Sequence, residues 1–171
     1  MTNPEITAIA TTSLAVASFL VAAFSLWTQR SHNRRSVCPV AEILFGDYEG
    51  SLFIKLANSG VGPLTVVSVS VEDGVNKKGN VIDWMPGSIE YTDFVSVVSG
   101  RSIRPGSELV LLMLSERNNG DGFAERRDQC RAILNRLTIK VNYKDIYGKT
   151  RLSCCRPFRA ERSCEWFGRN L

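Results

Sequence analysis

The sequence predicts a mainly β protein in which an N-terminal transmembrane helix precedes an antiparallel β-sandwich with one amphipathic helix. Three observations predict it. Residues 6–27 form an apolar run without a charged residue, proline or glycine. From residue 37 onward, short apolar runs alternate with Gly, Pro, Asn and Asp, which is typical of short strands joined by turns. Residues 121–136 alone place apolar side chains at helical spacing between charged ones.

The apolar run at 6–27 has the length of a membrane-spanning helix. It extends for about 33 Å, which matches a hydrocarbon core of about 30 Å. Trp27 at its end suits the membrane interface, and its Thr and Ser residues can bond to carbonyls of their own helix. A cleaved signal peptide is one alternative, but it would carry Lys or Arg before a shorter run. A buried core helix, the other alternative, would normally have a polar face.

The residues that flank the run predict its orientation. Basic residues follow it: Arg30, His32, Arg34 and Arg35. Only Glu5 and the terminal amine precede it. By the positive-inside rule, residues 1–5 form a short extracytoplasmic N-terminus, and a basic juxtamembrane linker (28–36) leads to a cytoplasmic domain (37–171). We therefore expect a single-pass protein of the inner, cytoplasmic membrane.

The soluble part, residues 37–171, is expected to form one domain. Turn signals bound eight expected strands: 40–45, 51–57, 64–71, 81–85, 94–98, 109–114, 137–143 and 150–154. Asp121 is expected to cap the amphipathic helix at 121–136. This number of short strands favours an antiparallel sandwich or small barrel, with the helix across one end.

Three stretches of this domain carry a resemblance: "LFIKLANSGVGPLTVVSVSVEDG", "SIRPGSELVLL" and "LTIKVNYKDIYGKT". They are similar to a pattern in small bacterial single-pass membrane proteins of unassigned role, in which an N-terminal anchor helix precedes an immunoglobulin-like β-sandwich. The resemblance covers most of residues 40–153 and implies a fold but no activity. Its motifs are turn residues: Asn58, Gly60, Gly62 and Pro63, then Pro105-Gly106, then Tyr143-x-Asp145-x-x-Gly148.

These turn residues have physical reasons. Glycines at 60 and 62 are expected to adopt the positive φ that a branched residue resists. Pro105-Gly106 suits a type II turn, because Pro presets φ and Gly takes the left-handed position. The carboxylate of Asp145 is expected to bond the local amides of a hairpin.

Cysteine and histidine usage argues against a catalytic or metal site. The odd number of cysteines leaves one unpaired in any disulfide scheme, and a cytoplasmic domain keeps them reduced: Cys38, Cys130, Cys154, Cys155 and Cys164. The only histidine lies beside the membrane run, so no nucleophile has a His base in the domain. We expect no metal, no cofactor and no enzymatic activity, with a zinc site from Cys154, Cys155 and Cys164 as the remaining metal alternative.

The C-terminal stretch is the main candidate contact site. It interleaves arginines with aromatics: Arg151, Arg156, Arg159, Arg162, Trp166 and Phe167. Such a set can contact a membrane surface, a phosphate ligand or a protein partner. The alternative is a final strand or tail whose aromatics pack on the domain while the arginine stems extend to water. The net charge of +4 is too small and diffuse for nucleic acid to be an expected partner.

The sequence favours a membrane-tethered, non-enzymatic binding or interaction module at the cytoplasmic face of a bacterial membrane, with an unidentified protein partner. The alternative is a membrane effector whose β domain senses a small phosphate-bearing ligand and alters membrane integrity. Small residues on the apolar run also favour helix association and a homo-oligomer: Ala15, Ala17, Ser18, Ala22, Ala23 and Ser25.

Overall fold

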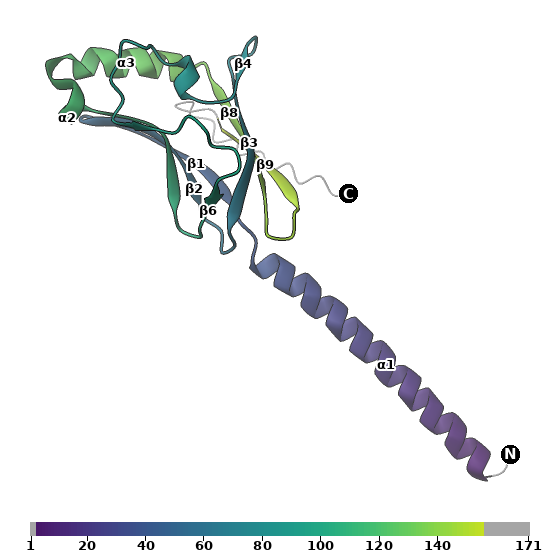
Figure 1. The fold of residues 1–171 in the computed structure, drawn as a ribbon. Coiled ribbons are helices and arrows are strands. Elements are labelled where there is room, and N and C mark those ends of the chain that lie inside the picture. Colours follow the sequence, from purple (N-terminus) through teal and green to yellow (C-terminus); the bar gives the residue numbers. More distant parts are fainter. Residues whose placement is uncertain (1–2, 156–171) are drawn as a thin grey trace. The chain divides into compact units, whose positions relative to one another are not determined.

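A computed structural model describes residues 3–155, apart from the side chains of Asn3 and Arg35. The chain divides into two compact units, Met1–Val37 and Cys38–Leu171. Each unit is described by itself. The first is a single helix, and the second contains two antiparallel sheets and the remaining helices (Figure 1).

The first unit is the helix α1, which runs from Asn3 to Ser36. Its stretch Pro4–Arg34 is long and apolar enough to cross a membrane. Several hydroxyl groups within it bond to carbonyls of the preceding turn, as predicted: Thr12 Oγ1 donates to Ala8 O at 2.8 Å and Ser18 Oγ to Leu14 O at 2.8 Å. These bonds satisfy the hydroxyl hydrogens without water, which is the condition for Ser and Thr to lie in lipid.

Helix α1 continues through the residues that were expected to form a linker. It ends at Ser36 and not near Trp27. The reason lies in the sequence: residues 28–36 include no glycine or proline, and the first helix breaker is Pro39. The basic residues of the expected linker therefore extend the helix by about 13 Å at 1.5 Å per residue.

The second unit contains two antiparallel sheets. The first has the order β1-β2-β7-β5, with β1 at Ala41–Tyr48, β2 at Ser51–Asn58, β7 at Glu108–Ser115 and β5 at Asp93–Phe94. The second has the order β4-β3-β8-β9, with β4 at Lys77–Lys78, β3 at Leu64–Glu72, β8 at Thr138–Lys144 and β9 at Thr150–Cys155. The short strand β6 (Ser102–Ile103) pairs with the start of β3.

Buried residues from both sheets form one hydrophobic cluster. The alternation of the long strands creates it, because every second side chain of a strand points to the same face. In β2 the residues Leu52, Ile54 and Leu56 are fully buried. The opposing sheet contributes Leu64, Val66, Val69, Val71, Ile139, Val141 and Tyr143.

Two expected strands are wrong, and for different reasons. Residues 81–85 contain a 3-10 helix, η1 (Ile82–Trp84), with Val81 and Met85 buried on either side. A short apolar run fits a strand or a helical turn equally well. In 94–98 only Phe94 belongs to a strand, because the chain then leaves β7 for the other sheet, where Val66 N donates to Arg101 O at 2.9 Å.

The amphipathic helix is present but begins later and is capped differently. It is α3 (Phe123–Leu134), preceded by α2 (Glu116–Asn119) and the 3-10 turn η2 (Gly120–Gly122). Asp121 is not its cap, since it lies within η2 and the N-cap position belongs to Gly122. Figure 1 shows α3 lying along one end of the two sheets.

Arginines of α3 hold it to the turn between β1 and β2. Arg127 Nη1 donates to Tyr48 O and Glu49 O, each at 3.2 Å. Arg131 Nε donates to Asp47 Oδ2 at 2.6 Å, which raises the pKa of Arg131. These charge-assisted bonds, together with buried Cys130 and Leu134, explain how the helix is positioned.

The turns predicted at Pro105-Gly106 and at Asp145 and Gly148 are confirmed. Asp145 Oδ1 accepts hydrogen bonds from Tyr147 N and Lys149 N, both at 2.9 Å, within the β8–β9 hairpin. Gly148 in that hairpin has φ of 78°, and Gly106 after Pro105 has φ of 69°. Both angles are in the left-handed region, which glycine adopts without steric cost. The positive φ predicted for Gly60 and Gly62 is wrong, and a close approach of Val40 N, 2.4 Å from an added Cβ, accounts for glycine at position 60 instead.

Candidate functional site

Most of the expected C-terminal site lies outside the described residues. Arg156, Arg159, Arg162, Trp166 and Phe167 all follow Cys155, the last described residue. Arg151 is described: it is partly buried on β9 opposite Tyr143 of β8. The expectation of a contact site built from these residues therefore stays a prediction.

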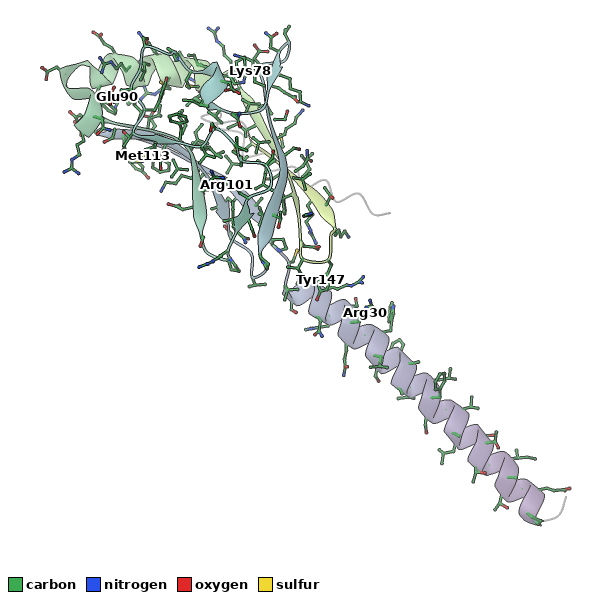
Figure 2. The ribbon with its side chains drawn as sticks, in the orientation of Figure 1. Arg30, Lys78, Glu90, Arg101, Met113 and Tyr147 are labelled. Atoms are coloured by element: carbon green, nitrogen blue, oxygen red, sulfur yellow. The ribbon has the colours of Figure 1, made fainter. Side chains whose placement is uncertain are left out.

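The basic residues after the apolar run lie on the last turns of α1. Arg30 and Arg34 are exposed, and Arg30 projects from the helix in Figure 2. Arg35 belongs to the same helix. Three arginines within two turns concentrate positive charge at one end of the apolar stretch.

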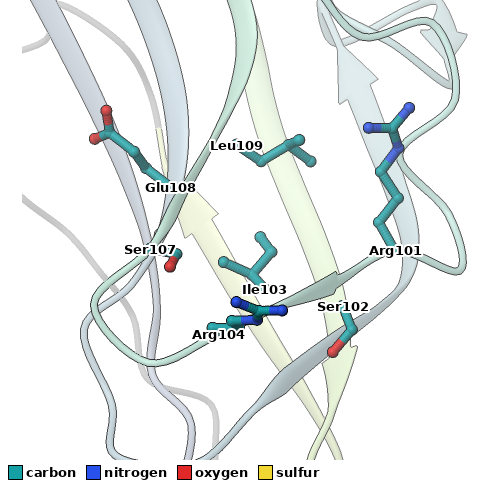
Figure 3. A pocket seen from close by; sticks show the side chains of 7 residues that line it. All are labelled: Arg101, Ser102, Ile103, Arg104, Ser107, Glu108 and Leu109. Carbon is teal, nitrogen blue, oxygen red and sulfur yellow. The ribbon is translucent and has the colours of Figure 1, made fainter.

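A hollow of about 460 Å³ lies where the chain passes from one sheet to the other. Its lining comes from the end of the β5–β6 connection, β6, the following turn and the start of β7 (Figure 3): Arg101, Ser102, Ile103, Arg104, Ser107, Glu108 and Leu109. In Figure 3 the apolar side chains of Ile103 and Leu109 lie between Arg101 on one side and Ser107 on the other.

Backbone hydrogen bonds fix the lining. β6 pairs with β3 through Leu64 and Ile103. The turn then closes with Ser107 N donating to Arg104 O at 3.1 Å. Gly106 N donates to Asn58 O at 2.8 Å, which ties the turn to the end of β2. The two arginines are therefore presented by backbone that both sheets hold in place.

Arg101 and Arg104 are exposed. Arg101 Nε donates to Val97 O at 2.9 Å, which orients the guanidinium and leaves its terminal nitrogens to other acceptors. Within residues 3–155, no carboxylate forms an ion pair with either arginine. Planar guanidinium groups bind phosphate and carboxylate oxygens in pairs.

Glu108 is the only acid in the lining, and it already has a partner. Its carboxylate forms an ion pair with Lys55 of β2. Ser102 and Ser107 add two hydroxyl groups that can donate to an oxygen. The hollow therefore presents two cations and two neutral donors beside the side chains of Ile103 and Leu109, which suits a small anion with an apolar portion.

Neither the models of known protein families nor curated protein sequences match this chain. The geometry of the described residues is therefore the basis for any assignment.

The cysteines and acidic residues form no alternative site in the described part of the chain. No group of three or more His, Cys, Asp or Glu side chains there is arranged to hold a metal ion. Cys130 is fully buried with Tyr91 Oη 3.9 Å from its sulfur, and burial raises the pKa of its thiol. A neutral, buried thiol is a poor nucleophile.

Sequence reasoning missed Arg101 and Arg104 because it interpreted "SIRPGSELVLL" as turn chemistry alone. The available signal was the spacing: two arginines and two serines enclose a strand and a Pro-Gly turn within seven residues, 101–107. Residue spacing does not reveal that Ile103 and Leu109, which belong to different sheets, line the same hollow.

Proposed function

We propose that this protein is a membrane-tethered, non-enzymatic binding module whose β domain lies in the cytoplasm of a bacterial cell and binds a small phosphate-bearing anion. The hollow between β6 and β7 carries the proposal, because Arg101 and Arg104 present guanidinium donors there without a described carboxylate partner. Two arginines beside Ile103 and Leu109 favour a ligand that has both a phosphate and an apolar group.

An immunoglobulin-like fold for the domain is part of this proposal. It is supported by the strand orders β1-β2-β7-β5 and β4-β3-β8-β9. Lettered along the chain with β5 as strand D and β4 as strand C′, these orders correspond to A-B-E-D and C′-C-F-G, the arrangement of immunoglobulin-like sandwiches. Domains of this kind bind through loops and strand edges and need no catalytic groups.

Membrane anchoring through α1 is supported by its surface. The apolar window of the helix has none of its area buried in the described chain, with Phe19 71% and Trp27 69% exposed. Apolar side chains around a whole helix require an apolar surrounding, which the bilayer provides. The cytoplasmic placement of the domain rests on Arg30, Arg34 and Arg35.

Titration with AMP tests the ligand proposal directly. The full chain in detergent micelles is titrated with AMP, with adenosine as the ligand that lacks phosphate. We expect AMP to bind and adenosine not to bind. We expect Arg101→Gln or Arg104→Gln to weaken AMP binding roughly tenfold, since each removes a charge-assisted bond to phosphate.

The matched control is Arg117→Gln, which removes an exposed arginine from α2. It should leave AMP affinity unchanged. The proposal is wrong if AMP fails to bind, if adenosine binds equally well, or if all three substitutions weaken AMP alike.

Topology is tested with a membrane-impermeant thiol reagent on intact cells. Cys38, Cys154 and Cys155 are partly exposed, whereas Cys130 is buried. We expect protection in intact cells and labelling after lysis, with Cys130 labelled only after denaturation because it is buried. Labelling in intact cells, or labelling that requires reductant even after denaturation, would place the domain outside the cytoplasm.

A second candidate function follows from the same hollow on a membrane-anchored domain. A ligand that binds there can act as the signal of an effector that alters membrane integrity. Dye-loaded vesicles that contain the full chain separate the two functions. A passive tether releases no dye when AMP is added, whereas the effector releases dye, and Arg104→Gln abolishes that release.

A further inference from the structure

One end of the β domain, here called the base, gathers three turns beside the point where the chain begins the domain. The 59–63 turn joins β2 to β3, the 104–107 turn joins β6 to β7, and the 145–149 turn joins β8 to β9. The pairing Thr65↔Lys144 places the end of β8 next to the start of β3. The segment 38–40, here called the incoming chain, is bonded to the 59–63 turn. Val61 N donates to Cys38 O at 3.3 Å, and Ser59 N donates to Val40 O at 2.9 Å.

The tips of the base carry exposed apolar side chains. Val61 is 68% exposed, Ile146 56% and Tyr147 49%, and Figure 2 shows Tyr147 at the tip of its hairpin. These residues come from two of the three turns, 59–63 and 145–149. An aromatic and two aliphatic side chains on rigid turns are suited to the lipid headgroup boundary.

Two lysines flank these apolar tips. Lys144 and Lys149 are exposed, and neither ammonium forms an ion pair with another described residue. The acids nearby are occupied: Asp145 accepts backbone amides, and Glu42 Oε2 accepts a bond from Ser59 Oγ at 2.6 Å. Each lysine near an anionic leaflet contributes about 1 kcal/mol to the free energy of membrane binding.

The chain that links α1 to the base is short. Only Val37 separates Ser36, the last residue of the helix, from Cys38, which is bonded into the base. Residues 28–36 rise about 13 Å beyond the apolar run. The headgroup layer itself is about 5–8 Å thick on each side. Because this rise exceeds the thickness of the layer, an upright helix places Ser36 about 5–8 Å beyond the headgroups. Docking of the base therefore requires α1 to tilt in the bilayer, as transmembrane helices commonly do.

We propose that the base of the domain docks on the anionic lipid surface of the membrane, with Val61, Ile146 and Tyr147 at the headgroup boundary and Lys144 and Lys149 over the headgroups. The docked turns fix how the domain meets the membrane. This inference rests on the proposed anchoring of α1. The 104–107 turn belongs both to the base and to the lining of the hollow, but none of the five docking residues lines the hollow.

Site-specific photocrosslinking tests the docking. Benzoylphenylalanine is placed at one position at a time in the full chain, which is reconstituted in nanodiscs of phosphatidylcholine with phosphatidylglycerol. We expect lipid adducts from positions 61 and 147. The matched position is Val75, a 93% exposed valine in the turn after β3. β3 extends from Leu64 to Glu72, about 30 Å at 3.3 Å per residue, so position 75 should give no lipid adduct.

Position 26 on α1 distinguishes failure of docking from failure of anchoring. An adduct at 26 without adducts at 61 and 147 overturns the docking and leaves the anchoring intact. No adduct at 26 overturns the anchoring. Equal adducts at 61 and 75 show random collision with lipid and also overturn the docking.

The lysines are tested by lipid composition. Adduct yield at position 147 should fall about fivefold for each lysine neutralised in Lys144→Gln and Lys149→Gln. In nanodiscs of phosphatidylcholine alone, the yield should be low and unaffected by these substitutions. Equal yields in both lipids would show that the headgroup charge has no role. That result would overturn the proposed contact of Lys144 and Lys149 with anionic headgroups.

Discussion

We expect Asn58→Ala to lower the free energy of unfolding by about 3–5 kcal/mol. Asn58 is fully buried at the end of β2, and its amide makes four hydrogen bonds. Nδ2 donates to Gly62 O at 2.8 Å and Ile103 O at 3.0 Å. Oδ1 accepts from Val40 N at 3.3 Å and Gly60 N at 3.1 Å. Alanine leaves all four backbone groups without this partner, and the two carbonyls, Gly62 O and Ile103 O, accept their bonds in buried surroundings.

Urea unfolding of the full chain in detergent micelles measures this loss. Asn118→Ala is the control, because Asn118 is exposed on α2, and it should change stability by less than about 0.5 kcal/mol. Because Asn58 joins the incoming chain, the 59–63 turn and β6, the loss should also speed hydrogen exchange at the base. A loss no larger than that of the control would contradict this role.

The second large effect is expected from Gly60→Ala, which should destabilise the domain by about 2–3 kcal/mol. An added Cβ at this position would lie 2.4 Å from Val40 N and 2.5 Å from Cys38 O. Both contacts are to backbone, which cannot rotate away. The incoming chain or the 59–63 turn must therefore shift, and the shift breaks the hydrogen bond from Val61 N to Cys38 O.

Gly79→Ala provides the matched control for this substitution. A Cβ at position 79 meets nothing within 4 Å, and the backbone there has no positive φ. The same chemical change should therefore alter the urea midpoint little or raise it slightly, since alanine restricts the unfolded chain. Equal effects of the two substitutions would show that the close contact at Gly60 does not affect the stability of the domain.

Several features of the fold could be predicted because they depend on neighbouring residues. The turn at Asp145 and Gly148 is local, since a carboxylate and two amides within four residues define it. The long strands alternate apolar and polar side chains, so β2, β3, β7 and β8 could be placed. The helix hydroxyl bonds of α1 are equally local.

The failed predictions have in common that distant contacts decided them. Val81, Trp84 and Met85 are compatible with a strand or a helical turn, and packing on the core selected the 3-10 turn. Asp121 is a good cap by residue type. The tight turn η2 occupies its position, and α3 begins where its arginines reach Asp47 and the β1–β2 turn.

By itself, the sequence determined the helix α1, its apolar surface and basic end, the long strands and the glycine and aspartate turns, because each depends on residue type and spacing within a few neighbours. Only the tertiary structure decided that Asn58 joins three segments, that Arg101 and Arg104 flank one hollow, and that Val61 and Tyr147 share one end. These arrangements depend on which strands pair across 40 or more residues of sequence. Local propensity does not encode such pairing, and the burial of a common core selects it.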